Sequence, residues 1–370
     1  MKISVVVPVY KQPKRVADIA SKILADSWND REMIILVDGD ANPDIELALE
    51  PVRGKAEILY NGRQLGKAAT INRFALSHET DAFLFLDNDI LLPDDSLFLT
   101  KLAEYMEGRD LAEIPKEAIA NSTIGRMMSF EFLTNAMLSM TMASCAGVSP
   151  SMNGAAFAVR AGLFRELGGF DPVINEDMDF AARAFERNAR FGYPKGLRVG
   201  NEVPANGQEW FVQRKRWALN NIVWLRDYGK LMLRKLPQTP ALLLATLFVL
   251  LPLLMNFAVF FAANQTHLTL IVPLLFYASQ HLRVLSGIMM HHPNIAALSV
   301  SGWFASFIGM IVAGGVFFGF ARKLKFRFNI FDFILFYLIY SPIWMVSNVV
   351  MFLAVLFKAE VRLDWKVVKE

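Results

Sequence analysis

Apolar residues in the first part of the chain fall into short continuous runs, separated by stretches with helical spacing. Runs rich in Val, Ile, Leu and Phe predict strands at residues 3–10, 32–40, 56–61 and 82–89. Amphipathic stretches predict helices at 14–28 and 66–78. Continuous apolar runs are typical of parallel strands that are covered on both faces. The pattern therefore predicts an α/β domain with a mostly parallel, Rossmann-like sheet.

The pattern changes near residue 240, beyond which charges become rare and the apolar runs grow long. Residues 241–263 contain no charge and are long enough to span a bilayer. With the segments 268–290, 295–320 and 330–357 they predict an α-helical transmembrane region of three or four crossings. Four crossings would leave the basic stretch RKLKFRF outside, against the positive-inside rule. One segment that lies in the interface or re-enters is therefore an alternative.

Composition agrees with this division. Of 370 residues 54% are hydrophobic, more than in an ordinary soluble protein. The net charge of +3 is too small to indicate a nucleic-acid partner, and the basic residues cluster near the apolar segments. A single cysteine, Cys145, excludes an intramolecular disulfide. The opening MKISVVVPVY resembles a strand and not a signal peptide, so we expect the N-terminal domain in the cytoplasm.

Acidic residues stand at the predicted carboxyl ends of the strands, where open parallel sheets bind ligands. Asp38 could accept hydrogen bonds there from a base or a ribose. Asp87 and Asp89 face one side, so both carboxylates can meet one cation, and such ligands suit Mg²⁺ or Mn²⁺ between phosphate oxygens. A solvated acidic turn is the alternative. The glycines form neither GxGxxG nor a Walker loop, which disfavours a dinucleotide or P-loop site.

Two helix starts carry further candidates. In GKAATIN, Gly66 lets a helix begin close to a ligand and Lys67 can offset phosphate charge, although a simple helix start explains both equally well. In VINEDMDF, Glu176 and Asp177 stand at the head of a helix. They are either charges favoured by the helix dipole, or they include a general base for an acceptor hydroxyl.

The segment EWFVQRKRWALNN, residues 209–221, precedes the apolar region. Gln213, Arg216 and Trp217 share one face of a helix there. The surrounding basic and aromatic residues predict an amphipathic helix that lies on lipid headgroups. Both interpretations can hold together if one face of the helix borders a site and another rests on the membrane.

The order of these motifs resembles the D, DxD, ED and QxxRW series of family 2 inverting glycosyltransferases with the GT-A fold. It is most similar to the membrane-integrated branch that includes hyaluronan, chitin and cellulose synthases and ceramide glucosyltransferase. The resemblance covers the first 220 residues, including VVVPVY and NGAAFAVRAGLFRELGGFD. Each motif alone is short and unspecific, whereas the ordered set followed by a membrane region is specific.

On the donor side, the resemblance implies that Asp38 and Lys67 hold the nucleotide and Asp87 the sugar diphosphate. Asp89, together with Asp87, would ligate Mn²⁺ or Mg²⁺. Arg216 would contact the diphosphate. A divalent ion and an arginine are the groups expected to stabilise a diphosphate leaving group. The implied enzyme is thus metal-dependent and uses a UDP-sugar.

On the acceptor side, the resemblance implies that Asp177 deprotonates the acceptor hydroxyl, with Glu176 beside it. Gln213 and Trp217 would border the acceptor, where an aromatic ring can stack on the apolar face of a sugar. A single displacement inverts configuration and requires no second carboxylate nucleophile. The motif set therefore disfavours a hydrolase, which would need two flanking carboxylates and a water.

These observations predict an organisation in four parts. Residues 1–208 form the cytoplasmic GT-A domain, and 209–236 the interfacial helix region with QxxRW. Residues 237–357 form the membrane region with three or four helices, and 358–370 a cytoplasmic tail. The expected protein is thus a multi-pass protein of the cell membrane, in contact with lipids.

The leading functional interpretation is a processive synthase that extends a polysaccharide. The alternative is transfer of a single sugar to a lipid or polyprenyl-linked acceptor. QxxRW favours the first, but three or four helices make a channel difficult to build unless the chain forms a homo-oligomer. A transporter is disfavoured, because only Arg283 and Asp332 interrupt the apolar segments with charge.

Overall fold

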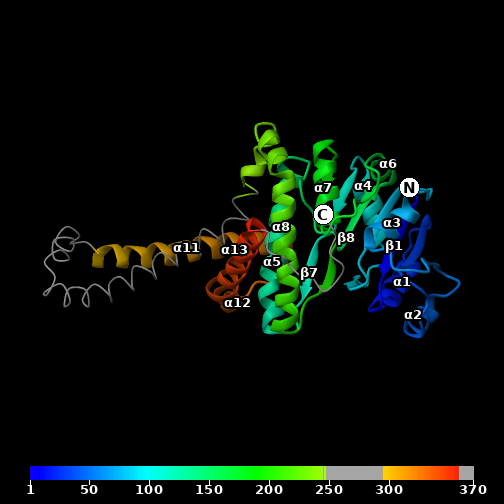
Figure 1. Ribbon diagram of the computed structural model, residues 1–370, viewed down its shortest axis with the longest axis horizontal. Helices are drawn as coiled ribbons and strands as arrows, with labels where there is room; N and C mark the ends of the chain where they lie inside the picture. Colours follow the sequence, from blue (N-terminus) through cyan, green and yellow to red (C-terminus); the bar gives the residue numbers. More distant parts are fainter. Residues whose placement is uncertain (245, 247–294, 358–370) are drawn as a thin grey trace. The chain divides into compact units, whose positions relative to one another are not determined.

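The computed structural model describes residues 1–244, 246 and 295–357 (Figure 1). By its internal contacts the chain divides into two units, Met1–Ala245 with Ser347–Glu370, and Thr246–Val346. Of the predicted apolar segments, 268–290 and nearly all of 241–263 lie outside the described residues.

The four predicted strands are all present in the first unit, as part of a seven-stranded sheet with the order β3-β2-β1-β4-β8-β6-β9. Val5, Val6 and Val7 of the first strand are completely buried, as a run covered on both faces must be. The strands are β1 (Ile3–Val9), β2 (Arg31–Val37), β3 (Glu57–Tyr60), β4 (Ala82–Leu86), β6 (Leu111–Glu113), β8 (Ala156–Arg160) and β9 (Phe191–Gly192).

The direction of one strand matters for the site. β3, β2, β1 and β4 pair in parallel, as predicted. β8 runs antiparallel between β4 and β6, with Leu86 opposite Ala156. The start of β8 therefore lies beside the carboxyl end of β4. This reversal, which the sequence pattern does not indicate, brings the residues before β8 to the edge where Asp87 stands.

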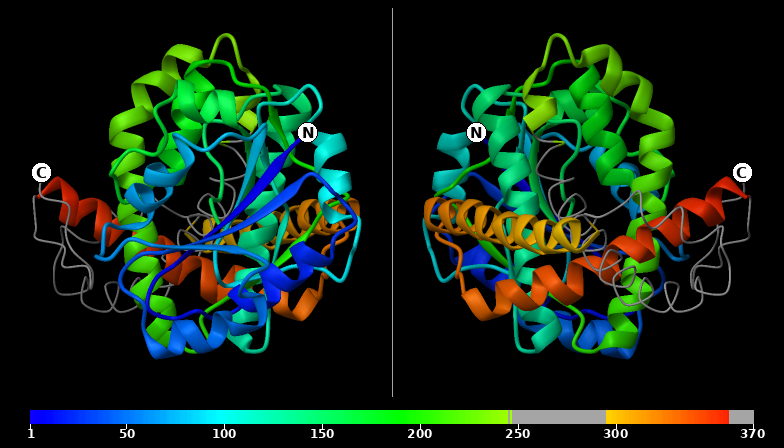
Figure 2. Two further views of the ribbon diagram at one scale, coloured as in Figure 1. Left: turned by 90° about the vertical axis from the view of Figure 1, so that its right-hand side faces the viewer. Right: turned by 90° about the vertical axis from the view of Figure 1, so that its left-hand side faces the viewer.

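Helices cover both faces of this sheet (Figures 1 and 2). Alternate residues of β1 face opposite layers, since Val5 and Val7 pack in one cluster and Val6 packs in the other. The first layer contains α1 (Val16–Ala25), α2 (Pro43–Leu49), the 3-10 turn η1 (Glu50–Val52) and α4 (Phe98–Met106). The second layer contains α3 (Lys67–Ala75), α6 (Ala161–Glu166) and α7 (Glu176–Glu186).

A small second sheet follows the acidic turn after β4. Its order is β5-β10-β7, with β5 (Ile90–Leu91), β7 (Lys116–Ile119) and β10 (Val199–Glu202). β5 begins directly after Asp89, and Glu202 N–H donates to the Asp89 carbonyl over 3.4 Å. Such short strands carry too few residues for a periodic signal, so the sequence pattern does not predict them.

Two long helices complete the first unit. α5 (Thr123–Cys145) buries much of its Met- and Phe-rich sequence. α8 (Gly207–Lys235) lies beside α5 (Figure 1), and the Arg214–Glu131 ion pair at 2.6 Å joins them. Asn206 caps α8, because its Oδ1 accepts from Glu209 N–H and its Nδ2 donates to the Glu209 carboxylate.

Helices α11 (Ile295–Leu324) and α12 (Ile330–Leu335) belong to the second unit. A π-helical turn, η2 (Phe336–Tyr340), leads into α13 (Ser341–Leu356), near Pro342, which has no N–H for the helical ladder. Two stretches of the described helices, with mean hydropathy 1.5 and 1.7, are long and apolar enough to cross a membrane: Phe307–Leu324 and Ile330–Ala354. Length and composition alone are weak evidence, so the predicted membrane crossings stay a prediction.

Candidate active site

The acidic residues collect at one edge of the large sheet. Asp38 follows β2, and Asp87 follows β4. The Asp87 N–H donates to the carbonyl of Ala155, just before β8, over 2.8 Å. Glu176 and Asp177 are the first residues of α7. The edge thus involves four chain segments at the place where open α/β sheets bind ligands.

Asp38 is buried and holds the loop that leads to α3. Its Oδ1 accepts from Leu65 N–H at 2.7 Å and from Thr70 Oγ1 at 2.9 Å, and its Oδ2 accepts from Gly66 N–H at 2.9 Å. Gly66 has φ +93°, a conformation that side chains rarely adopt. Asp38 therefore stabilises the turn before Lys67, and a nucleotide contact by its remaining acceptor capacity stays a prediction.

Lys67 joins the two acidic motifs. Its Nζ lies 2.7 Å from Asp87 Oδ1 and 3.4 Å from Glu176 Oε1. Burial disfavours the ammonium, but attraction to Asp87 and Glu176 outweighs burial and raises the pKa of Lys67 above its usual range. Burial, and next to it the charge of Asp177, raises the pKa of Glu176 against the opposing effect of Lys67. Lys67 therefore holds a fixed positive charge between the carboxylates.

Asp89 has the features of a metal ligand. Its Oδ1 is buried without a hydrogen-bond partner, and its Oδ2 lies 3.4 Å from Lys14 Nζ. Burial and the charge of Asp87 raise the pKa of Asp89, although Lys14 opposes them. Within the described residues no group of three or more His, Cys, Asp or Glu side chains could hold a metal. Asp87 and Asp89 would fit a divalent cation, which would need further oxygen ligands from a bound molecule.

Asp177 is fixed in orientation by its neighbours. Its Oδ2 accepts from Gly154 N–H at 2.7 Å, and its Oδ1 accepts from Met178 N–H at 2.8 Å. A Cβ on Gly154 would lie only 2.4 Å from the Asp177 Cβ, so this approach requires glycine. Each carboxylate oxygen has a second lone pair, which leaves capacity to accept a proton.

The QxxRW residues Gln213, Arg216 and Trp217 lie on one helix, α8, as predicted. Further along α8, Trp224 Nε1 donates to the Met178 carbonyl over 3.3 Å, which packs this helix against the start of α7. Trp217 lies two turns, about 10 Å, before Trp224 along the helix axis. Gln213 Oε1 accepts from the Arg214 guanidinium at 3.2 Å. The roles of Gln213, Arg216 and Trp217 toward donor and acceptor stay predictions.

Sequence reasoning missed three residues around the site. Arg214 is completely buried, and its guanidinium lies 4.2 Å from the centre of the Trp217 ring, so it packs against this residue of the QxxRW motif. Gly154 occurs in the quoted NGAAF stretch, but only the reversed β8 explains its contact with Asp177. Lys14 belongs to the loop after β1, where PKR gives no signal of proximity to Asp89.

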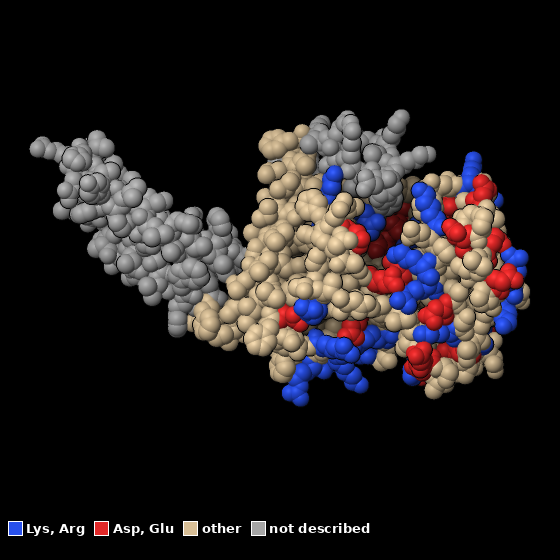
Figure 3. Space-filling model, turned by 90° about the horizontal axis from the view of Figure 1, so that it is seen from below, with Lys and Arg blue, Asp and Glu red and all other residues tan. Residues whose placement is uncertain are grey.

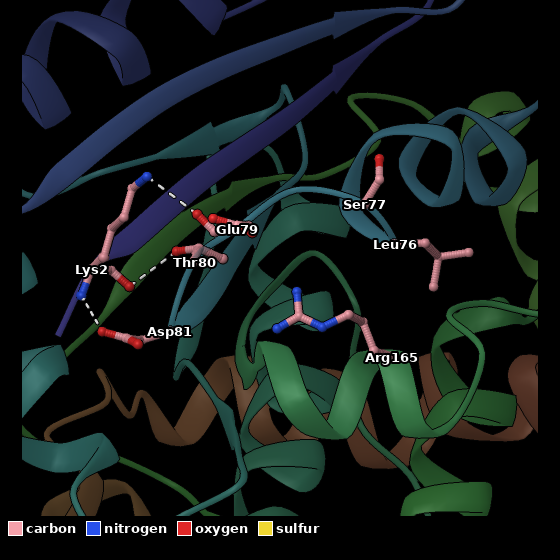
Figure 4. Close-up of a pocket in the computed structure, with 7 residues that line it drawn as sticks. All are labelled: Lys2, Leu76, Ser77, Glu79, Thr80, Asp81 and Arg165. Carbon is pink, nitrogen blue, oxygen red and sulfur yellow. Dashed lines mark hydrogen bonds between the residues drawn. The ribbon is translucent and has the colours of Figure 1, made fainter.

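A groove of about 610 Å³ lies at the opposite, amino-terminal ends of β1 and β4, away from the acidic edge (Figure 4). Its lining includes Lys2, whose backbone N–H donates to Asp81, and Arg165, whose guanidinium donates to the His78 carbonyl. The Lys2 ammonium pairs with the Glu32 carboxylate at 2.6 Å. On the right-hand part of the face drawn in Figure 3, acidic and basic side chains lie next to one another. The groove shares no residue with the acidic edge.

Comparison with known families decides the classification. Residues 82–358 match the family described as glycosyl transferase family group 2. The chain belongs to this family. The resemblance that the motif order carries is thereby confirmed, since the match covers most of the chain and includes Asp87, Asp177 and α8.

Curated relatives of this group 2 glycosyltransferase include two polysaccharide enzymes. This chain is 22% identical over 233 residues to the poly-β-1,6-N-acetyl-D-glucosamine synthase of Staphylococcus aureus, and the match covers 61% of this chain and 56% of that protein. It is 39% identical over 67 residues to the probable glucomannan 4-β-mannosyltransferase 14 of Arabidopsis thaliana, which is 18% of this chain and 12% of that one. The chain spans about half the length, or less, of these relatives.

Among solved structures, the fold is similar to that of a mannosyltransferase from Pyrobaculum calidifontis in complex with GDP-Man and Mn²⁺. The TM-score is 0.53 at 16% sequence identity, covering 84% of this chain and 86% of that one. At this identity the likeness shows the fold alone. The predicted GT-A-like α/β domain is therefore confirmed.

Proposed function

We propose that this chain transfers a sugar from a nucleoside-diphosphate sugar to a glycan hydroxyl with inversion, and that Asp177 is the base. The supporting observation is the convergence of β4, β8 and α7. Lys67 joins Asp87 to Glu176 within 3.4 Å, and Gly154 fixes Asp177 beside them. A donor diphosphate and an acceptor hydroxyl can both reach this edge of the sheet.

Asp87 and Asp89 would hold Mn²⁺ or Mg²⁺, which supplies positive charge to the diphosphate as it leaves. Lys67 adds a second, permanent positive charge at the same place. Arg216, on α8, would contribute a third positive charge at the diphosphate. These charges lower the free energy of the transition state because negative charge accumulates on the leaving group.

Asp177 carries out the proton transfer. Its carboxylate takes the proton of the acceptor hydroxyl while that oxygen forms a bond to the anomeric carbon. The bond from this carbon to the diphosphate oxygen breaks, and its electron pair leaves with the nucleoside diphosphate. Attack on the face opposite the leaving group inverts the configuration. The Gly154 and Met178 N–H groups keep the carboxylate in one orientation during this step.

The acceptor is proposed to be a growing polysaccharide, and the catalytic domain to lie on the cytoplasmic side of the membrane. The names of the two curated relatives, both polysaccharide enzymes, support this choice. The two apolar helical stretches agree with a membrane location. Transfer of one sugar to a lipid-linked acceptor is the second candidate, because a channel needs more helices than the sequence predicts for one chain. The donor nucleotide is proposed to be UDP, and GDP is tested beside it because the similar structure contains GDP-Man.

The test measures nucleoside diphosphate release in membranes with Mn²⁺ and UDP-Glc, UDP-GlcNAc, UDP-GlcA, UDP-Gal or GDP-Man. We expect release with one donor, its loss on chelation with EDTA, and its recovery with added Mn²⁺. Asp177→Asn should reduce release at least about 1000-fold, since the base is lost. Asp171→Asn, an exposed carboxylate before the same helix, is the matched control and should be active. Release unchanged in Asp177→Asn would refute the base, and sizing the product on a gel separates polymer from single adduct.

A further inference from the structure

The loop between β1 and α1 is hydrogen-bonded to Asn88, which lies between Asp87 and Asp89. Arg15 N–H donates to the Asn88 carbonyl over 3.0 Å, and Asn88 Nδ2 donates to the Gln12 carbonyl over 2.8 Å. The Arg15 guanidinium also pairs with Glu202 at 2.6 Å. Lys14, in the middle of this loop, has φ +25°. The loop backbone is therefore held at the acidic motif from both sides of Lys14.

The side chain of Lys14 is held less firmly than its backbone. Its Nζ lies 3.4 Å from Asp89 Oδ2, and the side chain is 40% exposed. Exposed ion pairs at such distances contribute little to stability, so this contact can be exchanged for another. The other oxygen of Asp89 is buried without a partner. Asp89 thus has one oxygen ready for a ligand and one covered by a movable cation.

We propose that Lys14 is a counter-ion that changes partner: it neutralises Asp89 in the free enzyme and binds the donor diphosphate once a divalent cation occupies Asp89. This inference rests on the proposed function, which supplies the metal and the donor. Two cations at one carboxylate repel each other, so metal binding displaces the lysine. A lysine ammonium on a flexible stem, anchored beside the motif, can then reach phosphate oxygens as a point charge.

The proposal predicts opposite effects on two affinities. Without nucleotide, Lys14 competes with the metal, so its removal should tighten Mn²⁺ binding. With metal present, Lys14 attracts the diphosphate, so its removal should weaken nucleotide binding. If the substitution disrupted the loop, both affinities would weaken. If Lys14 contacted only solvent, its removal would change neither affinity. The two signs together therefore separate a change of partner from either of these roles.

The experiment compares Lys14→Met with Lys11→Met, which removes an equal charge from the same loop where Lys11 lies over the Tyr10 ring. Mn²⁺ binding to the full-length protein is measured by electron paramagnetic resonance, and binding of UDP or GDP in saturating Mn²⁺ by calorimetry. For Lys14→Met we expect Mn²⁺ to bind about threefold more tightly and the nucleotide about fivefold more weakly, as exposed charge pairs are small in energy. Lys11→Met should change both less than about twofold.

Lys14→Arg keeps the charge, so both affinities should stay close to those of the wild type. Lys14→Gln is a second neutral variant and should behave like Lys14→Met. Mn²⁺ binding that is unchanged or weaker in the neutral variants overturns the proposal, as does nucleotide binding that is unchanged or tighter. Neither measurement needs sugar transfer. Opposite shifts in a protein that releases no nucleotide from any donor would support the role of Lys14 and refute the proposed function instead.

Discussion

Replacing Gly154 with alanine should inactivate the enzyme by displacing Asp177. The added Cβ would lie 2.4 Å from the Asp177 Cβ and 2.6 Å from its Oδ2. Carbon atoms in contact stay about 3.5–4.0 Å apart, so the two segments must separate by roughly 1 Å. Rotation of the Asp177 side chain cannot relieve the clash, because its Cβ is fixed to the backbone of α7. The loop before β8 or the start of α7 must move.

Two consequences of this movement can be estimated. The Gly154 N–H to Asp177 hydrogen bond of 2.7 Å is stretched or broken, and a displacement of about 1 Å at a reacting group costs roughly 100-fold in rate. Overpacking of this kind costs about 1–3 kcal/mol of unfolding free energy. In a unit of this size each kcal/mol lowers the melting temperature by about 2–4 °C. We therefore expect a protein that still folds at 25 °C but is nearly inactive.

The assay is nucleoside diphosphate release with Mn²⁺, combined with thermal unfolding followed by circular dichroism. Gly162→Ala is the matched control, because a Cβ there meets no atom within 4 Å and alanine favours the helix α6. This control should keep full activity and an equal or higher melting temperature. If Gly154→Ala released nucleotide within threefold of the wild-type rate, neither the close packing of Asp177 nor its fixed orientation would be needed for catalysis.

Two further predictions follow from buried charges. Burial, and after it the charge of Asp177, raises the pKa of Glu176 although Lys67 lowers it. Ionisation of Glu176 therefore destabilises the folded state as the pH rises above 4.5, the ordinary pKa of this group. Glu176→Gln should therefore gain stability over the wild type at pH 7 to 8, with the difference shrinking toward pH 4.5; a difference that grows as pH falls would contradict this sign. Arg214→Met should lose about 3–5 kcal/mol in urea unfolding, because it removes the fully buried guanidinium from the 2.6 Å ion pair with Glu131. Adding Glu131→Leu should recover part of this loss, and no recovery would exclude the ion pair as its cause.

The sequence predicts strands β1, β2 and β4 well because each is marked by a local pattern of residues. β1, β2 and β4 are runs of apolar residues bounded by polar ones, and hydrophobicity alone locates them. β5 and β9 have two residues each, and their existence depends on pairing with distant strands. The reversed direction of β8 is likewise a property of the whole sheet. No residue within Ala156–Arg160 specifies it.

The candidate site shows the same division. The acidic motifs could be found from their order, and the structure brings Asp87 and Glu176 together through Lys67. The sequence could not show that Asp38 is occupied by internal hydrogen bonds, because its partners lie in a loop whose path depends on Gly66. Nor could helical spacing identify Arg214, since its importance comes from burial against α5 and not from the face it shares with other residues.

The balance of charge at the acidic edge bears on the order in which ligands bind. Among the described residues, the ammonium groups of Lys14 and Lys67 pair with carboxylates of this edge, which belong to Asp87, Asp89 and Glu176, and Asp177 lies beside them. Burial, and after it the negative charge of a neighbouring carboxylate, raises the pKa values of Asp89 and Glu176. A diphosphate brings further negative charge and would be repelled from the edge as it stands. A divalent cation reverses this repulsion, so the donor should enter with the metal or after it, and raising Mn²⁺ should lower the apparent KM for the donor.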